Sequence, residues 1–424
     1  MASRKTANAR SLALQILREV LGGRGFAAER LDFHLNRQIL SEADRAFCTQ
    51  LVYGVLREQG YLDQVLGRYV AVKKTPAGVF LLLRLAAYQG LFLQKVPDYA
   101  LVNESVALAK SRFGIPPSRL VNAVLRRLLR DREELLAEGS ERFAACFPAW
   151  LVGRWRGRYG SEGARRLFEY FQAVPPVGIR VNRLRADPEA LLREWGEQGV
   201  NGVRLGSGPL LSLSAYHREI LAPSLAQGRI SIQDPHSFRV AEAVAAQPEE
   251  RGLDACAGHG GKSSAIAESV GDRLELWAHE PNPRRRAELQ ENFRRLGLKE
   301  PSLLASPAAA KQQGLSFDWI LVDAPCSGLG TLGRKPEIRW RVREDDLPDL
   351  ARQQGQILRE WWPFLKPGGR LVYAVCSLEP EEGEQVLADL LKTESELRLE
   401  QAREWSPLDS PGDGFFVANL RRRE

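Results

Sequence analysis

Closely spaced cysteine pairs, long apolar runs and internal repeats are all absent from this chain of 424 residues. The cysteines are odd in number and far apart, so neither a zinc site nor a disulfide scaffold is expected, and we predict no bound metal. They lie at Cys48, Cys146, Cys256, Cys326 and Cys376. Free cysteines at such spacings fit a reducing compartment.

Hydrophobic patterning argues against any association with membranes. No stretch reaches the ~18 consecutive apolar residues that a membrane-spanning helix needs. Residues 1–10 contain no apolar run that could act as a signal peptide. We therefore expect a cytoplasmic protein that does not bind membranes, and we expect it to be a monomer.

A basic charge balance is the first positive feature of the sequence. The formal net charge is +7, and arginines cluster within positions 119–132 and 154–166. The guanidinium fork matches the geometry of a phosphate group, so this balance favours a nucleic-acid partner. Each cluster taken alone is equally consistent with a solvated helix face.

The chain is too long for one ordinary core, which predicts two or three domains. Residues 1–135 place apolar side chains at helical spacing, which predicts an all-helical domain of about five to seven helices. Helix breaks are expected at Gly22-Gly23, Gly60, Pro97 and Pro116-Pro117. A charged linker is expected at residues 131–140.

Two parts with mixed secondary structure follow the helical domain. Residues 148–226 begin with a helix rich in arginine and tryptophan and continue as a small α/β module, with strands expected at 177–182 and 203–205 and a helix at 188–196. In residues 228–424, short apolar strands alternate with longer helices. This alternation predicts a Rossmann-like α/β domain, a mostly parallel sheet with helices on both faces. The strands are expected at 252–254, 274–278, 319–323, 370–375 and 414–420.

A glycine-rich turn joins the first of these strands to the following helix. It reads Cys256-Ala257-Gly258-His259-Gly260-Gly261-Lys262. Glycines let a ligand approach the backbone, and free N–H groups at a helix N-terminus favour negative charge. About 20 residues further on, Glu280 ends the next strand, where a carboxylate can bind ribose hydroxyls. We therefore predict a nucleoside cofactor held by this turn, the glycine loop, and by Glu280.

A P-loop is the alternative interpretation of the same turn. Gly261-Lys262-Ser263 matches the end of that motif, but Cys256 stands where its first glycine would fall. The glycine loop therefore favours a nucleoside cofactor over an NTPase site.

Two cysteines and an aspartate follow strands of the same predicted sheet. Asp323-Ala-Pro-Cys326 ends one strand, and Tyr373-Ala-Val-Cys376 ends another. Ligands bind beyond the carboxyl ends of parallel strands, so these residues and the glycine loop should meet at one edge. Methylation of a pyrimidine at carbon 5 needs a thiolate that adds at carbon 6. Cys326 and Cys376 are therefore the candidate nucleophiles, and we expect the other three cysteines to be small buried hydrophobes.

With these motifs in place, the sequence resembles bacterial small-subunit ribosomal RNA cytosine-5 methyltransferase B, the Sun or Fmu family. The likeness spans nearly the whole chain. Besides the glycine loop and the two cysteine motifs, it rests on Asp44–Ala46, Tyr53–Arg57, Leu120–Arg126, Arg180–Asn182 and Gln233-Asp234. The resemblance implies a NusB-like, RNA-binding helical domain and a class I methyltransferase domain that uses S-adenosyl-L-methionine. It also implies a cytosine of 16S ribosomal RNA as substrate, which must leave its stack to reach a buried thiolate.

The resemblance also implies roles for individual residues. Cys376 would be the covalent nucleophile, and Cys326 would assist elimination and product release. Asp323 would lie at the junction of base and cofactor. The loop from Cys256 to Lys262 would bind the methionine part of S-adenosyl-L-methionine, and Glu280 would bind the ribose.

Two departures from the family pattern concern the cofactor. His259 stands where the family usually has proline, and no Asp or Glu occurs from 301 to 317, where an acid usually lies near the adenine. Backbone groups or Ser306 would then contact the adenine. The missing acid also motivates an alternative, a non-catalytic RNA-binding or ribosome-assembly protein with a degenerate methyltransferase domain. A DNA cytosine-5 methyltransferase that uses Cys326 is disfavoured by the helical domain and by the second cysteine.

Overall fold

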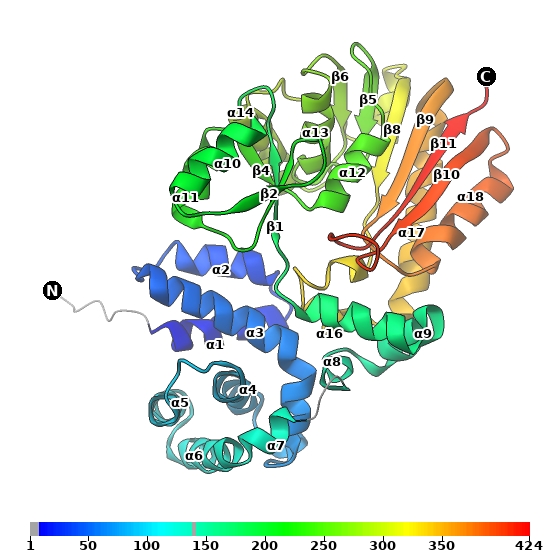
Figure 1. Cartoon of the computed structure of the whole chain (residues 1–424). Helices are drawn as coiled ribbons and strands as arrows, with labels where there is room; N and C mark the ends of the chain where they lie inside the picture. The colour runs from blue at the N-terminus through cyan, green and yellow to red at the C-terminus, as the bar shows by residue number, and fades with distance from the viewer. Residues whose placement is uncertain (1–7, 138–140) are drawn as a thin grey trace. The chain divides into compact units, whose positions relative to one another are not determined.

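The computed structural model describes residues 8–137 and 141–424, and the chain divides into two compact units. The helical unit runs to Ala173 and also contains Leu332–Arg341. The second unit, Val174–Thr331 with Val342–Glu424, contains both sheets (Figure 1). No helix in the described part of the chain is long and apolar enough to cross a membrane.

The helical unit is built from helices that bury one apolar stripe each. In α6 the buried residues include Val121, Val124, Leu125 and Leu128, which recur at the spacing of one helix face. The all-helical N-terminal part is therefore confirmed. Its helices are α1 (Ala9–Leu21), α2 (Ala27–Leu35), α3 (Glu42–Gly67), α4 (Ala77–Phe92), α5 (Asp98–Phe113), α6 (Ile115–Arg130), α7 (Arg132–Leu136), α8 (Glu141–Ala145) and α9 (Ala149–Gln172), with the turn η1 (Val72–Lys74).

Two predicted interruptions of this unit are wrong. Helix α3 continues through Gly60, where a Cβ atom would lie 2.0 Å from the carbonyl oxygen of Ala145. The glycine therefore serves close packing, and that packing outweighs its helix-propensity cost of about 1 kcal/mol. Helix α7 occupies part of the segment 131–140, which was expected to be a linker and of which residues 138–140 lie outside the described residues.

The helical unit also incorporates a segment from far along the chain. Within Leu332–Arg341, the fully buried Arg339 of α16 (Ile338–Arg341) donates hydrogen bonds to backbone carbonyls. These belong to Arg57 at 3.2 Å and Phe171 at 2.7 Å. Glu337 accepts a hydrogen bond from the backbone N–H of Ala27 at 2.6 Å. The pattern of the sequence does not predict this insertion, because one arginine that reaches carbonyls leaves no periodic signal.

The second unit begins with a small antiparallel sheet of order β2-β3-β1-β4. Its elements are β1 (Val177–Val181), α10 (Pro188–Glu197), β2 (Gly202–Arg204), β3 (Leu210–Leu213), α11 (Arg218–Ala226) and β4 (Ile230–Ile232). Strands β3 and β4 and helix α11 have no counterpart among the predicted elements. Since β4 pairs with β1, the sheet of this small module extends past residue 226.

The larger sheet has the order β10-β11-β9-β8-β5-β6-β7. Strands β5 to β9 pair in parallel, and β10 and β11 form an antiparallel edge. The strands are β5 (Arg251–Asp254), β6 (Glu275–Ala278), β7 (Ser302–Leu303), β8 (Phe317–Asp323), β9 (Leu365–Val375), β10 (Leu397–Trp405) and β11 (Phe415–Arg422). The mostly parallel sheet is confirmed, with β7 and β10 added to the predicted strands.

Helices cover both faces of this sheet (Figure 1). Side chains alternate along β8, so that Trp319 and Leu321 pack in one cluster and Ile320 and Val322 in the other. The first cluster includes side chains of α12 (Pro235–Ala243), α13 (Gly261–Ser269) and α14 (Pro283–Leu296); the second includes those of α15 (Pro307–Gln312), α17 (Leu347–Trp361) and α18 (Val386–Thr393). Short turns η2 (Leu329–Thr331), η3 (Glu344–Asp346), η4 (Trp362–Phe364) and η5 (Glu381–Gln385) complete the unit.

The order of the parallel strands creates a switch point between β5 and β8. The chain proceeds from β5 outward to β6 and β7, and then returns to the opposite side of β5 as β8. Ligands of open α/β sheets bind beyond the carboxyl ends of the strands at such a point. Asp254 and Asp323 end the two strands that flank it.

Candidate active site

The glycine loop connects β5 to α13 at this switch point. Gly258 and Gly260 have φ angles of 54° and 78°, in the left-handed region that favours glycine. Gly260 is the N-cap of α13 and, because it has no side chain, it makes no side-chain cap hydrogen bond to the first turn. A helix start of this kind can bind a negatively charged group of a ligand.

Asp254 supports the loop from beneath. Its side chain is 1% exposed, and it accepts hydrogen bonds from Ser263 Oγ at 2.5 Å and from the backbone N–H of Cys256 at 3.2 Å. Burial raises the pKa of this carboxyl to about 6, and the negative charge of Asp323 acts in the same direction. Asp254 therefore joins both ends of the glycine loop, although sequence reasoning did not include it among the site residues.

Glu280 lies at the end of the neighbouring strand, β6. Its side chain is buried, and one carboxylate oxygen accepts from the backbone N–H of Asn282 at 2.8 Å. This bond fixes the turn before α14. It also holds the carboxylate of Glu280 at the strand end, where a contact with the ribose is expected. On the adenine side, Ser306 Oγ accepts from the backbone N–H of Ala309 as the N-cap of α15.

His259 projects away from the loop. Its side chain is 65% exposed and pairs with the carboxylate of Glu288, Nδ1 to Oε2, at 2.6 Å.

Within the described residues, no group of three His, Cys, Asp or Glu side chains could hold a metal ion.

Lys262 and Asp323 form an ion pair across the switch point. The distance from Nζ to Oδ2 is 2.6 Å, and the two side chains are 13% and 27% exposed. Burial opposes the charge of Lys262, but the carboxylate of Asp323 outweighs it and raises the pKa of the ammonium; Cys376 acts in the same direction. By reciprocity, the lysine charge favours the thiolate form of Cys376. Sequence reasoning assigned Lys262 only to the cofactor and missed this role.

The structure brings the two predicted cysteines together. Cys326 Sγ and Cys376 Sγ are 3.2 Å apart, and both side chains are partly buried. The hydrogen bond with Cys376, together with burial, raises the pKa of the Cys326 thiol well above its usual range. Burial and the contact with Cys376 therefore both favour the protonated form of Cys326. By contrast, Cys48 and Cys146 are fully buried in the helical unit.

A buried carboxylate holds the two cysteine turns in place. Glu382 accepts hydrogen bonds from the backbone N–H and the hydroxyl of Ser327, at 2.8 and 2.5 Å, and from Gln354 at 3.0 Å. Ser327 Oγ also lies 3.2 Å from Ser377 Oγ. Each serine directly follows one of the two cysteines, so Glu382 fixes their spacing. The sequence signal for this role is the acidic residue Glu382 shortly after the Cys376-Ser377 motif, and sequence reasoning did not include it among the site residues.

These residues fit S-adenosyl-L-methionine. The uncapped first turn of α13 suits a carboxylate, and the buried Glu280 suits ribose hydroxyls. The paired thiols of Cys326 and Cys376 lie at the same edge of the sheet, where the side chain of an activated cysteine can reach a bound substrate. A Rossmann-like sheet with this site defines the protein as a methyltransferase of the Rossmann-like class.

Comparisons with known proteins identify the family. Residues 241–421 match the model of 16S rRNA methyltransferase RsmB/F, residues 7–130 match the NusB family, and residues 147–209 match the RsmF/B-like ferredoxin-like domain. The probable ribosomal RNA small subunit methyltransferase B of Bacillus subtilis is 31% identical, with 99% of this chain and 100% of that one covered. The Synechocystis protein of that name is 32% identical, with 98% and 99% covered.

Solved structures agree on the fold. PH0851 covers 98% of this chain and 99% of its own with a TM-score of 0.81 at 24% identity. A methyltransferase homologue from Pyrococcus horikoshii covers 68% of this chain and 98% of its own with a TM-score of 0.56 at 28% identity. The chain belongs to the ribosomal RNA small subunit methyltransferase B family, and its cofactor is S-adenosyl-L-methionine. The NusB-like helical domain and the small α/β module are likewise confirmed, and the family model identifies that module as a ferredoxin-like domain.

Proposed function

We propose that this protein methylates carbon 5 of a cytosine in small-subunit (16S) ribosomal RNA, with Cys376 as the covalent nucleophile. The observation that carries the proposal is the 3.2 Å contact between the thiols of Cys326 and Cys376 at the cofactor edge. Relatives with full-length similarity bear the name ribosomal RNA small subunit methyltransferase B, which supports the substrate class.

The first step uses the charge beside Cys376. Lys262 favours the thiolate, which adds to carbon 6 of the cytosine, and the electron pair of the carbon 5–carbon 6 double bond then makes carbon 5 nucleophilic. S-adenosyl-L-methionine supplies the methyl group that carbon 5 accepts. Asp323 keeps one oxygen on Lys262, and its second oxygen can accept a hydrogen bond from the cytosine amino group.

The second step uses Cys326 as the base. While Cys376 is a thiolate, its hydrogen bond holds the proton on Cys326. When Cys376 becomes a neutral thioether, that influence disappears and Cys326 can release its proton to solvent. Its thiolate then takes the proton from carbon 5, the carbon 5–carbon 6 double bond forms again, and the bond from carbon 6 to Cys376 breaks.

The remaining parts of the chain have supporting roles in this proposal. The helical domain, residues 1–135, binds ribosomal RNA through its arginines, and the module at 148–226 adjoins the catalytic domain at 228–424. We propose that the enzyme acts as a cytoplasmic monomer. The loop Cys256–Lys262 holds the methionine part of the cofactor, with His259 contributing only its backbone because its side chain pairs with Glu288.

A covalent-adduct experiment separates the roles of the two cysteines. The purified Cys326→Ala and Cys376→Ala variants are incubated with 16S ribosomal RNA fragments and cofactor, and the products are run on a denaturing gel. We expect Cys326→Ala to accumulate a protein–RNA adduct, because it methylates but cannot eliminate, and Cys376→Ala to form none. The reverse pattern would overturn the assignment.

Calorimetric titration tests the alternative of a non-catalytic assembly protein. The wild-type chain and both cysteine variants should bind S-adenosyl-L-methionine with similar affinity, since neither thiol belongs to the cofactor loop. A wild-type chain that gives no binding signal at millimolar cofactor would favour the alternative, whatever its affinity for RNA.

A further inference from the structure

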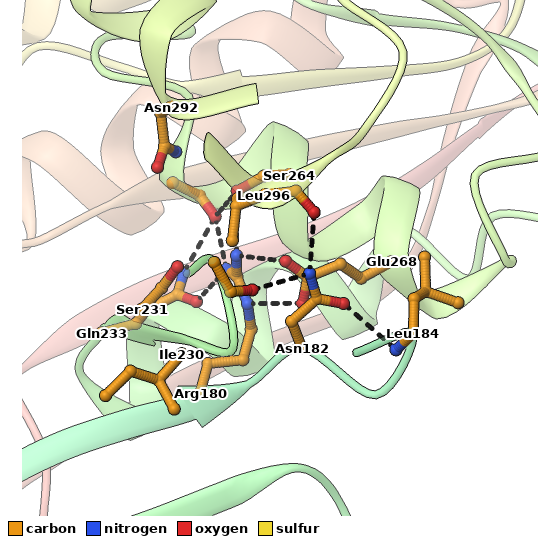
Figure 2. A network of polar contacts seen from close by, with 12 residues as sticks. Arg180, Asn182, Leu184, Ile230, Ser231, Gln233, Ser264, Glu268, Asn292 and Leu296 are labelled. Carbon is orange, nitrogen blue, oxygen red and sulfur yellow. Dashed lines mark hydrogen bonds and ion pairs between the residues drawn. The ribbon is translucent and has the colours of Figure 1, made fainter. Parts of the chain in front are cut away.

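One buried arginine of the small module, Arg180, contacts the glycine loop. Arg180 lies on β1, and its side chain is 1% exposed. Its guanidinium donates to both carboxylate oxygens of Glu268 at 3.0 and 2.9 Å, and to Gln233 Oε1 at 2.5 Å (Figure 2). It also donates to the carbonyl oxygen of Gly261 at 2.7 Å and to Ser264 Oγ at 2.9 Å. These contacts use all five N–H donors of the group.

Two of the acceptors belong to the first turn of α13. Gly261 belongs to the glycine loop and directly follows Gly260, the N-cap of α13. The carbonyl oxygen of Gly261 also accepts from Gln233 Nε2 at 3.3 Å. Ser264 lies at the end of the same first turn and is fully buried. The arginine therefore holds the turn whose N–H groups point toward the loop, and it does so through the carbonyl and hydroxyl groups of that turn.

Glu268 makes the arrangement rigid. It lies near the C-terminal end of α13, and its pKa is raised by burial, an effect that Arg180 opposes. The bidentate pair with Arg180 compensates for burial of the carboxylate, whereas a single unpaired charge there would be strongly destabilising. Arg180 thus forms hydrogen bonds with both the first turn and the last turn of α13.

Asn182, the residue directly after β1, connects the small module to a different helix, α14. Asn182 is also 1% exposed, and its Nδ2 donates to the carbonyl of Gly228 at 3.0 Å. The same Nδ2 donates to the carbonyl of Leu296 at 3.1 Å (Figure 2). Leu296 ends α14, so this contact leaves the first turn of α13 untouched. The two side chains are equally buried and two residues apart, which makes Asn182 a matched control for Arg180.

We propose that Arg180 is a positioning residue for cofactor binding, through which the small module holds the glycine loop in its binding-competent form. The proposal rests on the assignment of this loop to S-adenosyl-L-methionine. It gives the small module a function in the reaction besides any contact with RNA. The contact that carries the proposal is the hydrogen bond from Arg180 to the carbonyl oxygen of Gly261, a residue of the glycine loop itself.

The test measures cofactor affinity and local rigidity in the full-length protein. Arg180→Lys keeps a positive charge beside Glu268 but loses the planar fork, and the double variant Arg180→Met with Glu268→Gln removes the buried charges together. S-adenosylhomocysteine is titrated into each protein by calorimetry, and hydrogen exchange is followed at the amides of residues 260–264. Asn182→Ala is the control.

We expect both Arg180 variants to bind S-adenosylhomocysteine about tenfold more weakly, within the usual range of coupling between packed elements. Exchange in the first turn of α13 should rise in both. Asn182→Ala should lower the unfolding midpoint but leave the dissociation constant within twofold of the wild type. A folded Arg180 variant with unchanged affinity would overturn the proposal. A wild-type protein that fails to bind the ligand would instead sink the cofactor-loop assignment.

Discussion

The buried carboxylate of Asp254 allows a prediction of stability against pH. Burial raises its pKa from 3.8 to about 6, so the folded protein binds this proton more tightly than the unfolded chain does. The folded state is then penalised for ionisation, and the penalty grows as the pH rises from about 4 to about 6. A shift of this size corresponds to roughly 3 kcal/mol at neutral pH.

Asp254→Asn should remove this penalty while keeping the shape of the side chain. The amide oxygen can still accept from the backbone N–H of Cys256, whereas Ser263 Oγ must reverse from donor to acceptor. Both hydrogen bonds lose their charge assistance in the variant, which offsets roughly 1 kcal/mol. We therefore expect the variant to be more stable than the wild type by about 2 kcal/mol at neutral pH.

The assay is urea unfolding without cofactor, at about pH 7.5 and about pH 5. At the lower pH the ionisation penalty falls to roughly half, so the advantage of the variant should shrink. Asp318→Asn is the opposite control: burial would raise the pKa of Asp318, but Lys366 and the backbone N–H of Arg251 outweigh it and lower the pKa. That variant should be less stable than the wild type at both pH values. An Asp254→Asn protein that is less stable at neutral pH, or whose advantage ignores pH, refutes the reasoning.

Two further substitutions probe packing and the thiol geometry. Glu382→Gln should lower the rate of methyl transfer by about tenfold to a hundredfold, because the carboxylate that fixes the Ser327 turn is lost; single-turnover kinetics should show this while calorimetry gives an unchanged cofactor affinity. Gly60→Ala should destabilise the protein by roughly 3 kcal/mol, because its Cβ would meet the Ala145 carbonyl at 2.0 Å. Gly153→Ala, where nothing lies within 4 Å, should be neutral or stabilising in the same thermal unfolding experiment.

Periodic patterns explain which elements could be predicted. The helices of the N-terminal part bury one face each, so their apolar residues recur at helical spacing. Strands such as β5 and β8 are buried on both faces, so they stand out in the sequence as short apolar runs. Short strands such as β3, β4 and β7 were not predicted, because two to four residues are too few to show a periodic pattern. The break predicted at Gly60 was wrong because a glycine used for close packing looks the same in sequence as one used for a break.

The candidate site divides in a similar way. The order of the strands and the motifs at their ends placed the glycine loop, Asp323 and the two cysteines at one edge, because parallel strands present their carboxyl ends together. The contacts of Asp254, Glu382 and Arg180 could not be derived in that manner. Each is a single buried polar residue whose partners lie on other elements, and its chemistry depends on those partners.

The sequence by itself therefore determined the family, the cofactor and the pair of candidate thiols, because these depend on residue types at fixed positions along the chain. Only the tertiary structure decided that the thiols lie 3.2 Å apart and that Lys262 carries its charge beside them. Only the structure, likewise, assigned Leu332–Arg341 to the helical unit. Distances between side chains from different elements, and the burial that shifts their proton affinities, arise from packing, and no local pattern in the sequence records them.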